Sequence, residues 1–552
     1  MLKAKIISSL EKVMLTDTLE SFQTVKELKA ARGERVSFQV IVEDPVEKGV
    51  QRAKAMTVSV RSKLSKWLKG FDVGYVPAQM PVYAERSTGA FVSTQPGLFP
   101  DVLYPLKKQK YYAHPYGVKA FWFTVELPED LEAGKYPIHI TLQGQEDHSV
   151  AKARVVIDVK SAVLPKSDLR YTQWFHCDSI ASFFGVKMQS EKHWKLIERF
   201  IATAAHTGVN MILTPIFTPP LDTAIGTYRP TMQLVDMEKQ GDRYSFGFEK
   251  LDRWVALCKK YGIQYFEMAH LFTQWGACAC PKIEAVVDGK LERIFGWDVP
   301  SDSPEYKKFL EQFLPALLAR LDKLGIRENC YFHISDEPNI SPKMPDYENY
   351  LKAKNMVKPL LQDGKIMDAL SHVEFFDNGL IECPVAATDA VEPFLEREMP
   401  ERWCYYCCSQ GLLVANRFLA MPSFRNRVTG VQLYMNGMDG FLHWGFNYYY
   451  SRKAEFPIDP YQVTDGIYAW PSGDPFSVYP YENGAIESLR TVNFYEGLQD
   501  RMLLKALEQK VGPEAVKTMV EEIAGCKVSF TECLDANILT AIHDKALDLL
   551  AE

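Results

Sequence analysis

Hydrophobic and polar positions along the chain follow two different periods. In residues 1–165 apolar side chains recur in short alternating runs, for example at 35–42 and 119–125, and Pro, Gly and Asp residues separate the runs. Alternation is typical of strands that bury one face, and several short strands joined by tight turns indicate a β-sandwich. We therefore expect an all-β sandwich domain over residues 1–165.

From residue 166 onward short apolar runs alternate with segments of helical period, which predict helices near 191–206, 248–261, 302–324 and 347–362. Strands that alternate with helices form a parallel sheet, and eight of them in residues 166–450 fit a (β/α)8 barrel of the TIM type. The expected barrel strands lie near residues 171–176, 210–214, 264–270, 330–335, 369–373, 385–388, 403–408 and 440–444.

Residues 451–552 begin as an aromatic loop rich in Pro and Gly and continue as helical segments near 485–508, 513–524 and 537–550. We expect this C-terminal extension to pack on the barrel. The predicted fold class is thus multidomain, with an N-terminal sandwich, a catalytic-type barrel and a helical C-terminal extension. The sequence leaves open whether the last helices only cover the barrel or also pair with a second copy in a homo-oligomer.

Two adjacent carboxylates follow the fourth predicted barrel strand. Residues 330–338 read as a short strand that runs into Asp336, Glu337 and Pro338, and Pro338 cannot continue a central ladder. Enzymes with this barrel place their catalytic residues at the carboxyl ends of the strands. Two neighbouring carboxylates repel each other, which raises one pKa and suits a general acid near neutral pH. Asp336 and Glu337 are therefore the candidate catalytic residues.

Polar and aromatic residues also follow the other predicted strands. Aromatic faces pack on the apolar side of a sugar ring, while His, Asp and Asn side chains bond its hydroxyl groups. The pattern predicts a pocket for a sugar, and its candidate substrate-binding residues are His176, His270, Trp275, His333, Asp389, Trp444 and Asn447.

Composition narrows the possible partners. A formal charge of -7 without a long basic run argues against nucleic acid. No apolar stretch reaches the roughly 18 residues of a membrane helix, and the first residues lack a secretory signal pattern. Eleven scattered cysteines fit free thiols in a reducing compartment. We expect a cytoplasmic protein whose partner is an oligosaccharide or glycoside substrate, with neither nucleic acid nor membrane bound.

The sequence predicts neither a metal nor a cofactor. Cys278 and Cys280 are too closely spaced for a structural zinc site, and no matching Cys/His pair follows them. No glycine-rich phosphate loop is present either.

The seventh predicted strand, 403–408, ends without a carboxylate. A retaining glycosidase with a protein nucleophile needs a second carboxylate roughly 5–5.5 Å from the acid, and Asp178 and Asp389 are the candidates for it. In the alternative mechanism the 2-acetamido group of the substrate is the nucleophile, one acid protonates the leaving oxygen and a second carboxylate orients the amide. An adjacent Asp-Glu pair could supply both groups if the backbone bends at the end of the strand.

The chain resembles glycoside hydrolase family 123, whose characterised members are β-N-acetylgalactosaminidases. The resemblance rests on residues 35–42 and 120–136 of the sandwich and on residues 295–298 and 332–338 of the barrel. It implies a retaining, substrate-assisted mechanism in which Glu337 is the general acid/base and Asp336 orients the acetamido group. A barrel that binds carbohydrate without turnover is the competing hypothesis, because a fold does not fix a function.

Overall fold

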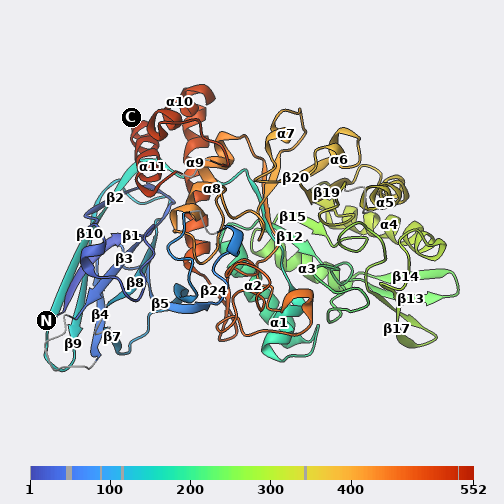
Figure 1. The fold of residues 1–552 in the computed structure, drawn as a ribbon, viewed down its shortest axis with the longest axis horizontal. Coiled ribbons are helices and arrows are strands. Elements are labelled where there is room, and N and C mark those ends of the chain that lie inside the picture. The colour runs from blue at the N-terminus through green and yellow to red at the C-terminus, as the bar shows by residue number, and fades with distance from the viewer. Residues whose placement is uncertain (1, 45–52, 87–89, 114–116, 341–344, 532–533) are drawn as a thin grey trace.

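Two β-sheets form the N-terminal part of the structure, a computed structural model that describes residues 2–44, 53–86, 90–113, 117–340, 345–531 and 534–552. They pack face to face around a core that includes Phe38, Phe123 and Ile140, at the blue end of the molecule in Figure 1. In sheet order, the first comprises β1 (Lys3–Ser8), β3 (Arg35–Glu43), β8 (Val118–Glu126), β5 (Leu68–Ala78) and β6 (Gly97–Pro105). The second comprises β2 (Glu27–Arg32), β10 (Val150–Val163), β9 (Gly134–Gly144), β4 (Lys54–Arg61) and β7 (Tyr111–Ala113).

Eight parallel strands close into a barrel, and each corresponds to a strand that the sequence predicts. The fifth strand begins and ends earlier than expected, because the chain turns after Leu370 into a short helix. Around the barrel the strands are β11 (Arg170–Gln173), β12 (Met211–Thr214), β15 (Tyr265–Met268), β18 (Cys330–Phe332), β19 (Lys365–Leu370), β20 (Cys383–Ala387), β21 (Trp403–Tyr405) and β22 (Gly440–His443).

Side chains alternate between the inside and the outside of the barrel. On β21, Trp403 and Tyr405 lie in the cluster that fills the interior, whereas Cys404 lies in the outer core beneath the helices. Period-two alternation is what a strand backbone imposes. The barrel is therefore a packed core, and its carboxyl ends are the place where side chains can reach a ligand.

Helices cover the barrel as the helical periodicity predicts. The longest in the barrel, α4, starts at Ser303, whose hydroxyl accepts the N–H of Tyr306, and stops at Gly325, which takes a left-handed φ of 63°. The helices are α1 (Cys177–Phe184), α2 (Glu191–His206), α3 (Glu249–Lys260), α4 (Pro304–Leu324), α5 (Asp346–Leu361), α6 (Glu374–Asp377), α7 (Glu392–Leu395), α8 (Phe424–Met435), α9 (Leu489–Val511), α10 (Pro513–Ala524) and α11 (Ala536–Ala551). Among the described residues, no helix combines the length and the apolar character needed to cross a membrane.

A small sheet that the sequence did not predict projects from the barrel. Its strands belong to the connections after β12 and β15, and Figure 1 shows them at the end opposite the sandwich. Their many charged side chains obscure the alternation, so hydrophobic pattern alone does not reveal them. In sheet order they are β14 (Arg243–Gly247), β13 (Asp236–Gln240), β16 (Ile283–Val287) and β17 (Lys290–Phe295), and a separate hairpin pairs β23 (Tyr479–Tyr481) with β24 (Gly484–Ile486).

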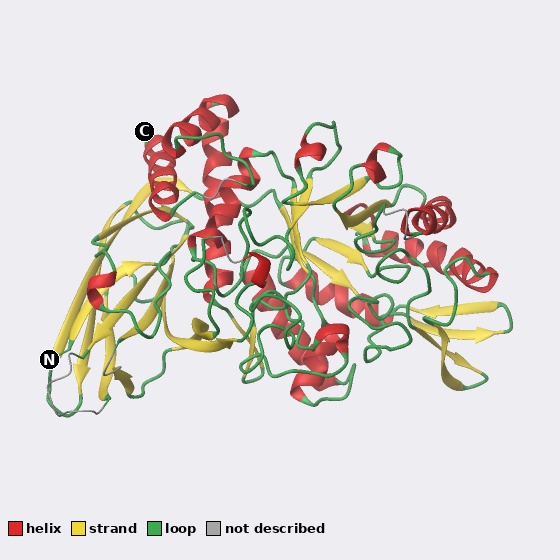
Figure 2. Cartoon of the chain, in the orientation of Figure 1, coloured by secondary structure: helices red, strands yellow, loops and turns green. Residues whose placement is uncertain are grey.

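The C-terminal helices contact the sandwich as well as the barrel. Helix α9 packs along α8 of the barrel, while α11 packs against α9 and against β10 and β2 of the sandwich. Figure 2 shows the long helix α9 running between the two parts, with α10 and α11 at its upper end. The extension therefore joins the two parts instead of covering the barrel alone.

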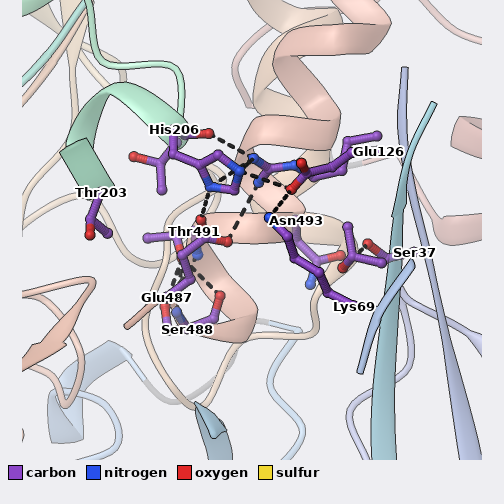
Figure 3. Close-up of polar contacts among 12 residues, drawn as sticks. Ser37, Lys69, Glu126, Thr203, His206, Glu487, Ser488, Thr491 and Asn493 are labelled. Atoms are coloured by element: carbon purple, nitrogen blue, oxygen red, sulfur yellow. Dashed lines mark hydrogen bonds and ion pairs between the residues drawn. The ribbon is translucent and has the colours of Figure 1, made fainter. Parts of the chain in front are cut away.

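A polar cluster at this junction links the sandwich, α2 and the extension (Figure 3). The His206 ring lies 2.9 Å from Glu126 on β8 and also contacts Glu487 just before α9, and Arg35 on β3 donates to the His206 carbonyl at 2.8 Å. Burial alone would lower the pKa of His206, but the bonds to Glu126 and Glu487 raise it. The same His206 bond lowers the pKa of Glu126 to about 2. The contacts therefore favour the charged forms of His206, Glu126 and Glu487.

A second junction is a fully buried ion pair. Arg490 at the start of α9 donates from Nη2 to Asp101 on β6 at 2.8 Å, and the Tyr479 hydroxyl donates to the same carboxylate at 2.6 Å. Both charged side chains are almost completely excluded from solvent. Burying two charges is costly, so the pair depends on every partner being present.

We predict that Asp101→Asn lowers the free energy of unfolding by about 3–5 kcal/mol, because it leaves the buried Arg490 guanidinium without a counter-charge. Urea unfolding at neutral pH measures the change. Glu482→Gln is the control: its partner Lys107 is exposed, so the loss should be small. Equal effects of the two substitutions would contradict the prediction.

Candidate active site

Asp336 and Glu337 lie together at the wall of a cavity of about 410 Å³ at the carboxyl ends of the barrel strands. Neighbouring residues in an extended chain point to opposite sides. Here Glu337 has a φ of 46°, a left-handed conformation, and its N–H donates to the Ala369 carbonyl at 3.1 Å. The resulting turn brings both carboxyl groups into the same cavity.

Glu337 is held by groups at the end of β21. The Tyr405 hydroxyl donates to Glu337 Oε1 at 2.7 Å, and the Cys407 thiol lies 3.9 Å from the same oxygen. Burial raises the pKa of Glu337, while the bonds from Tyr405 and Cys407 counteract part of that rise. A carboxyl with a raised pKa can keep its proton near neutral pH, as a general acid requires.

Asp336 is held from the loop after β15. Gln274 donates from Nε2 to Asp336 Oδ2 at 2.7 Å. The oxygen of the same amide accepts the N–H of Asp222 at 2.7 Å, which fixes the orientation of the Gln274 side chain. Burial raises the pKa of Asp336 strongly, and the negative charges of Glu337 and Asp368 raise it further. The two acids therefore compete for protons in one enclosed space.

A buried imidazole lies beneath the acid pair. His333 contacts Asp368 through Nδ1 at 3.0 Å and Glu267 through Nε2 at 3.1 Å, and all three side chains are fully buried. Burial alone would lower the pKa of His333, but the two carboxylates raise it to about 10. His333 is therefore a cation at neutral pH, and its charge favours the ionised form of Asp336.

His270 lies against this cation. Its ring stacks on His333 with the centroids 4.4 Å apart, and its nitrogens find no hydrogen-bond partner in the described part of the chain. His270, His333 and Asp368 have ligand atoms within 4.8 Å of one another, a spacing that a metal ion would tolerate. However, the lone pairs of stacked imidazoles lie in parallel planes and do not converge, and both nitrogens of His333 already contact carboxylates. The arrangement suits a buried ion pair better than a metal centre.

Aromatic rings form another wall of the cavity. Trp444, after β22, packs on Trp470 with the ring centroids 5.0 Å apart and donates from Nε1 to Asp474 at 2.9 Å. Trp275, on the loop after β15, also lines the cavity. Tyr83 reaches the cavity from the sandwich, and its hydroxyl donates to the Ala469 carbonyl at 3.2 Å. Flat faces beside hydrogen-bonding acids are what a sugar ring requires.

Comparison with known families identifies the chain. The family described as "Glycoside hydrolase 123, catalytic domain" matches residues 174–507, more than half of the sequence. The chain belongs to glycoside hydrolase family 123. The cavity at the end of the barrel is accordingly the candidate active site of a glycosidase.

One solved structure has the same fold as this chain. A family 123 glycoside hydrolase from Clostridium perfringens, studied for glycolipid glycan hydrolysis, aligns with a TM-score of 0.76 over 100% of this chain and 99% of that chain, at 16% identity. The β-glucuronidase of Parabacteroides merdae aligns with a TM-score of 0.33 over 91% of this chain and 51% of its own, at 10% identity, too distantly to inform the site. None of the curated proteins matches.

Four predicted site residues of this family 123 chain line the cavity: Asp336, Glu337, Trp275 and Trp444. The other five lie outside the lining. His333 and His270 are buried below the acids, and Asp389 is exposed and accepts from Gln410 at 3.0 Å.

His176 and Asn447 hold the backbone instead. His176 Nε2 lies 2.9 Å from the Trp444 carbonyl, and the Asn447 amide exchanges two hydrogen bonds with the His176 backbone. Asp178, one of the alternative nucleophiles, pairs with the buried Arg229 at 2.7 Å and also lies outside the lining.

Sequence reasoning missed other residues of the family 123 cavity, in particular Tyr405, Gln274, Asp222, Trp470 and Tyr83. The alternation of side chains along a strand could have predicted that Tyr405 points into the barrel, because Trp403 and Tyr405 lie on the same side of β21. The remaining four lie on loops or in another domain, and no local pattern marks them.

We predict that His333→Gln lowers the free energy of unfolding by about 3–5 kcal/mol at neutral pH, because Glu267 and Asp368 lose their buried cation. The folded pKa of about 10 lies above the unfolded value of about 6.5. The stabilisation is therefore complete below about pH 6.5 and is lost as the pH rises through about 10.

Urea unfolding of wild type and variant across this range measures the difference. His139→Gln, at an exposed position of β9, is the control and should show no such pH dependence. If the difference in the free energy of unfolding between wild type and His333→Gln stays constant up to pH 10, His333 is not a cation in the folded protein.

Proposed function

We propose that the protein hydrolyses β-linked N-acetylhexosaminides, with N-acetylgalactosamine as the preferred sugar, by a retaining, substrate-assisted mechanism. The observation that carries the proposal is the left-handed turn at Glu337, which places two adjacent carboxyl groups in one cavity. Substrate assistance needs a proton donor and an amide-orienting carboxylate side by side. The resemblance to family 123 supports the choice of sugar.

In the first step Glu337 donates its proton to the leaving oxygen. Asp336 accepts a hydrogen bond from the acetamido N–H and so holds the amide carbonyl oxygen against the anomeric carbon. That oxygen attacks, the glycosidic bond breaks, and an oxazoline-type intermediate forms. The amide N–H adds a donor to Asp336 beside Gln274, which favours the ionised Asp336 and leaves the proton on Glu337.

In the second step Glu337, now a carboxylate, takes a proton from water. The water attacks the anomeric carbon from the face that the leaving group vacated, the ring of the intermediate opens, and the sugar is released with net retention. The Tyr405 hydroxyl stabilises the charge that Glu337 carries at this stage. The Trp444 and Trp470 faces pack on the sugar and exclude water from the other side.

A third carboxylate, Asp222, also lines the cavity. Its Oδ2 accepts the Tyr448 hydroxyl at 2.7 Å and the Lys453 N–H at 2.8 Å, so this oxygen is already committed to holding the loops together. A conventional mechanism with a protein nucleophile would act on sugars that lack an N-acetyl group, and this difference separates the two mechanisms.

The glycoside is proposed to be the end of an oligosaccharide or of a glycolipid. The related Clostridium perfringens enzyme has been analysed for glycolipid glycan hydrolysis, and its similar fold supports extending that substrate class to this chain. The cytoplasmic location stays a prediction from the sequence.

The test is hydrolysis of a chromogenic β-N-acetylgalactosaminide beside the matching β-N-acetylglucosaminide and β-galactoside. We expect release from the N-acetylated sugars only, and a loss of about 10²–10⁴-fold in Glu337→Gln and a comparable loss in Asp336→Asn. Glu392→Gln, exposed on α7, is the control and should be fully active. Turnover of the plain galactoside would overturn substrate assistance, and no turnover of any sugar would favour a binding role.

We also predict that Tyr405→Phe moves the alkaline limb of kcat/KM to higher pH. In the wild type the Tyr405 bond holds the pKa of Glu337 below the value that burial alone would give, so its removal raises that pKa. Rate measurements against pH with the soluble glycoside reveal the shift. Tyr112→Phe, exposed on β7, should leave the profile unchanged, and an unmoved limb in Tyr405→Phe would argue against Glu337 as the acid.

A further inference from the structure

Three consecutive residues beside the cavity adopt left-handed backbone conformations. Gly466, Ile467 and Tyr468 have φ values of 62°, 64° and 55°. Glycine takes this conformation freely, but it costs other residues about 1–2 kcal/mol each, and it is a genuine outlier for a β-branched residue such as Ile467. Strain of this kind persists where the surroundings enforce it, and it is concentrated at functional sites.

Asp465 enforces the turn. Its carboxylate accepts the N–H of Ile467 at 3.0 Å, and its carbonyl accepts the N–H groups of Ala469 and Trp470, each at 3.0 Å. The turn buries Trp470 in the cavity wall. It also leaves Ile467 43% and Tyr468 66% exposed, directly before Ala469 and Trp470, which line the cavity. The strained backbone therefore holds two large apolar side chains in water.

Further exposed apolar side chains lie on loops that contribute to the cavity lining. Phe456 is 48% exposed and belongs to the same long connection after β22, and Trp275 is 43% exposed on the loop after β15. The loops are bonded to each other: Asp222 accepts the Lys453 N–H at 2.8 Å and donates its own N–H to Gln274 at 2.7 Å. The Arg452 N–H donates to the Gly466 carbonyl at 3.1 Å. We call Trp275, Phe456, Ile467 and Tyr468 the apolar rim.

Two exposed cations interrupt the apolar rim. Arg452 lines the cavity, where its charge acts on the Asp222 carboxylate, and Lys453 follows it. Both side chains are exposed, and within the described residues neither charged group forms a hydrogen bond or a close ion pair. The exposed acids Glu455 and Asp459 follow in the same connection, so the positive charge is confined to the Arg452–Lys453 pair. Cations among exposed aromatic and aliphatic side chains are typical of surfaces that meet lipid headgroups.

We propose that the apolar rim docks on the surface of a lipid assembly that displays the glycoside. Ile467 offers no flat face for a sugar but packs readily among acyl chains, while Tyr468 and Trp275 suit the headgroup layer. Arg452 and Lys453 face the phosphates. The orientation points the cavity at the headgroup, so a lipid-linked sugar enters the site as the rim binds. Turnover at the docked surface rests on the proposed function, whereas the docking itself does not.

Docking is tested by co-sedimentation with vesicles of phosphatidylcholine and phosphatidylglycerol that contain no glycoside. Wild type is expected to bind, and Ile467→Asn and Tyr468→Asn are each expected to bind about 10-fold more weakly, because each removes an apolar side chain that docking would bury. Asn tolerates the left-handed conformation, so the turn is kept. Leu291→Asn, at a 68% exposed position of β17, is the matched control and should bind as wild type does.

Turnover separates the two proposals. The variants should hydrolyse a soluble chromogenic glycoside at the wild-type rate, because Ile467 and Tyr468 do not line the cavity, but should lose about 10-fold on a lipid-linked glycoside in vesicles. Equal binding of wild type and variants to vesicles would overturn docking. Docking would also be overturned if the variants lost equal activity on the soluble substrate, because the turn would then only position Trp470. A loss of activity confined to long soluble oligosaccharides would overturn it as well. If neither substrate is hydrolysed, the proposed function fails, and vesicle binding still decides the docking.

Discussion

The site depends on one backbone constraint, the left-handed conformation of Glu337. A regular extended chain would direct Asp336 and Glu337 to opposite sides, and one acid would be lost to the interior. With a φ of 46° both acids line a single cavity. Bonds from the Glu337 N–H to the Ala369 carbonyl and from the Trp275 N–H to the Asp336 carbonyl hold the turn between strand β19 and the loop after β15. The barrel therefore supplies the rigid frame that a strained turn requires.

Electrostatics beneath the turn complete the site. Two carboxyl groups in a water-poor cavity would both tend to hold protons. The His333 cation, fixed between Glu267 and Asp368 on the barrel strands, lowers the pKa of Asp336. Gln274 adds a neutral donor to Asp336, and Tyr405 adds one to Glu337. The acids thus differ in their partners although they are adjacent in the sequence, and this difference lets one donate a proton while the other orients an amide.

The parts of the chain outside the barrel contribute to the same cavity. Tyr83 comes from the sandwich and Trp470 from the connection after β22, and a bond from the Tyr83 hydroxyl to the Ala469 carbonyl joins them. The buried Asp101–Arg490 pair anchors the start of α9 to β6 and so fixes the position of the sandwich relative to the barrel. The sandwich is therefore part of the wall of the site. The cavity belongs to the assembled chain and not to the barrel by itself.

The sequence by itself determined the eight barrel strands, the long helices and the acid pair, because hydrophobic period and chain order are local properties that survive without a structure. It also led to the family through residues around Asp336 and Glu337. Only the tertiary structure decided which strand-end residues face the cavity. His176 and Asn447 turn to the backbone, while Tyr405, Gln274 and Trp470 face the acids or the cavity. The reason is physical: beyond the end of a strand the direction of a side chain follows from loop dihedral angles and from distant partners, and neither is written in the local pattern.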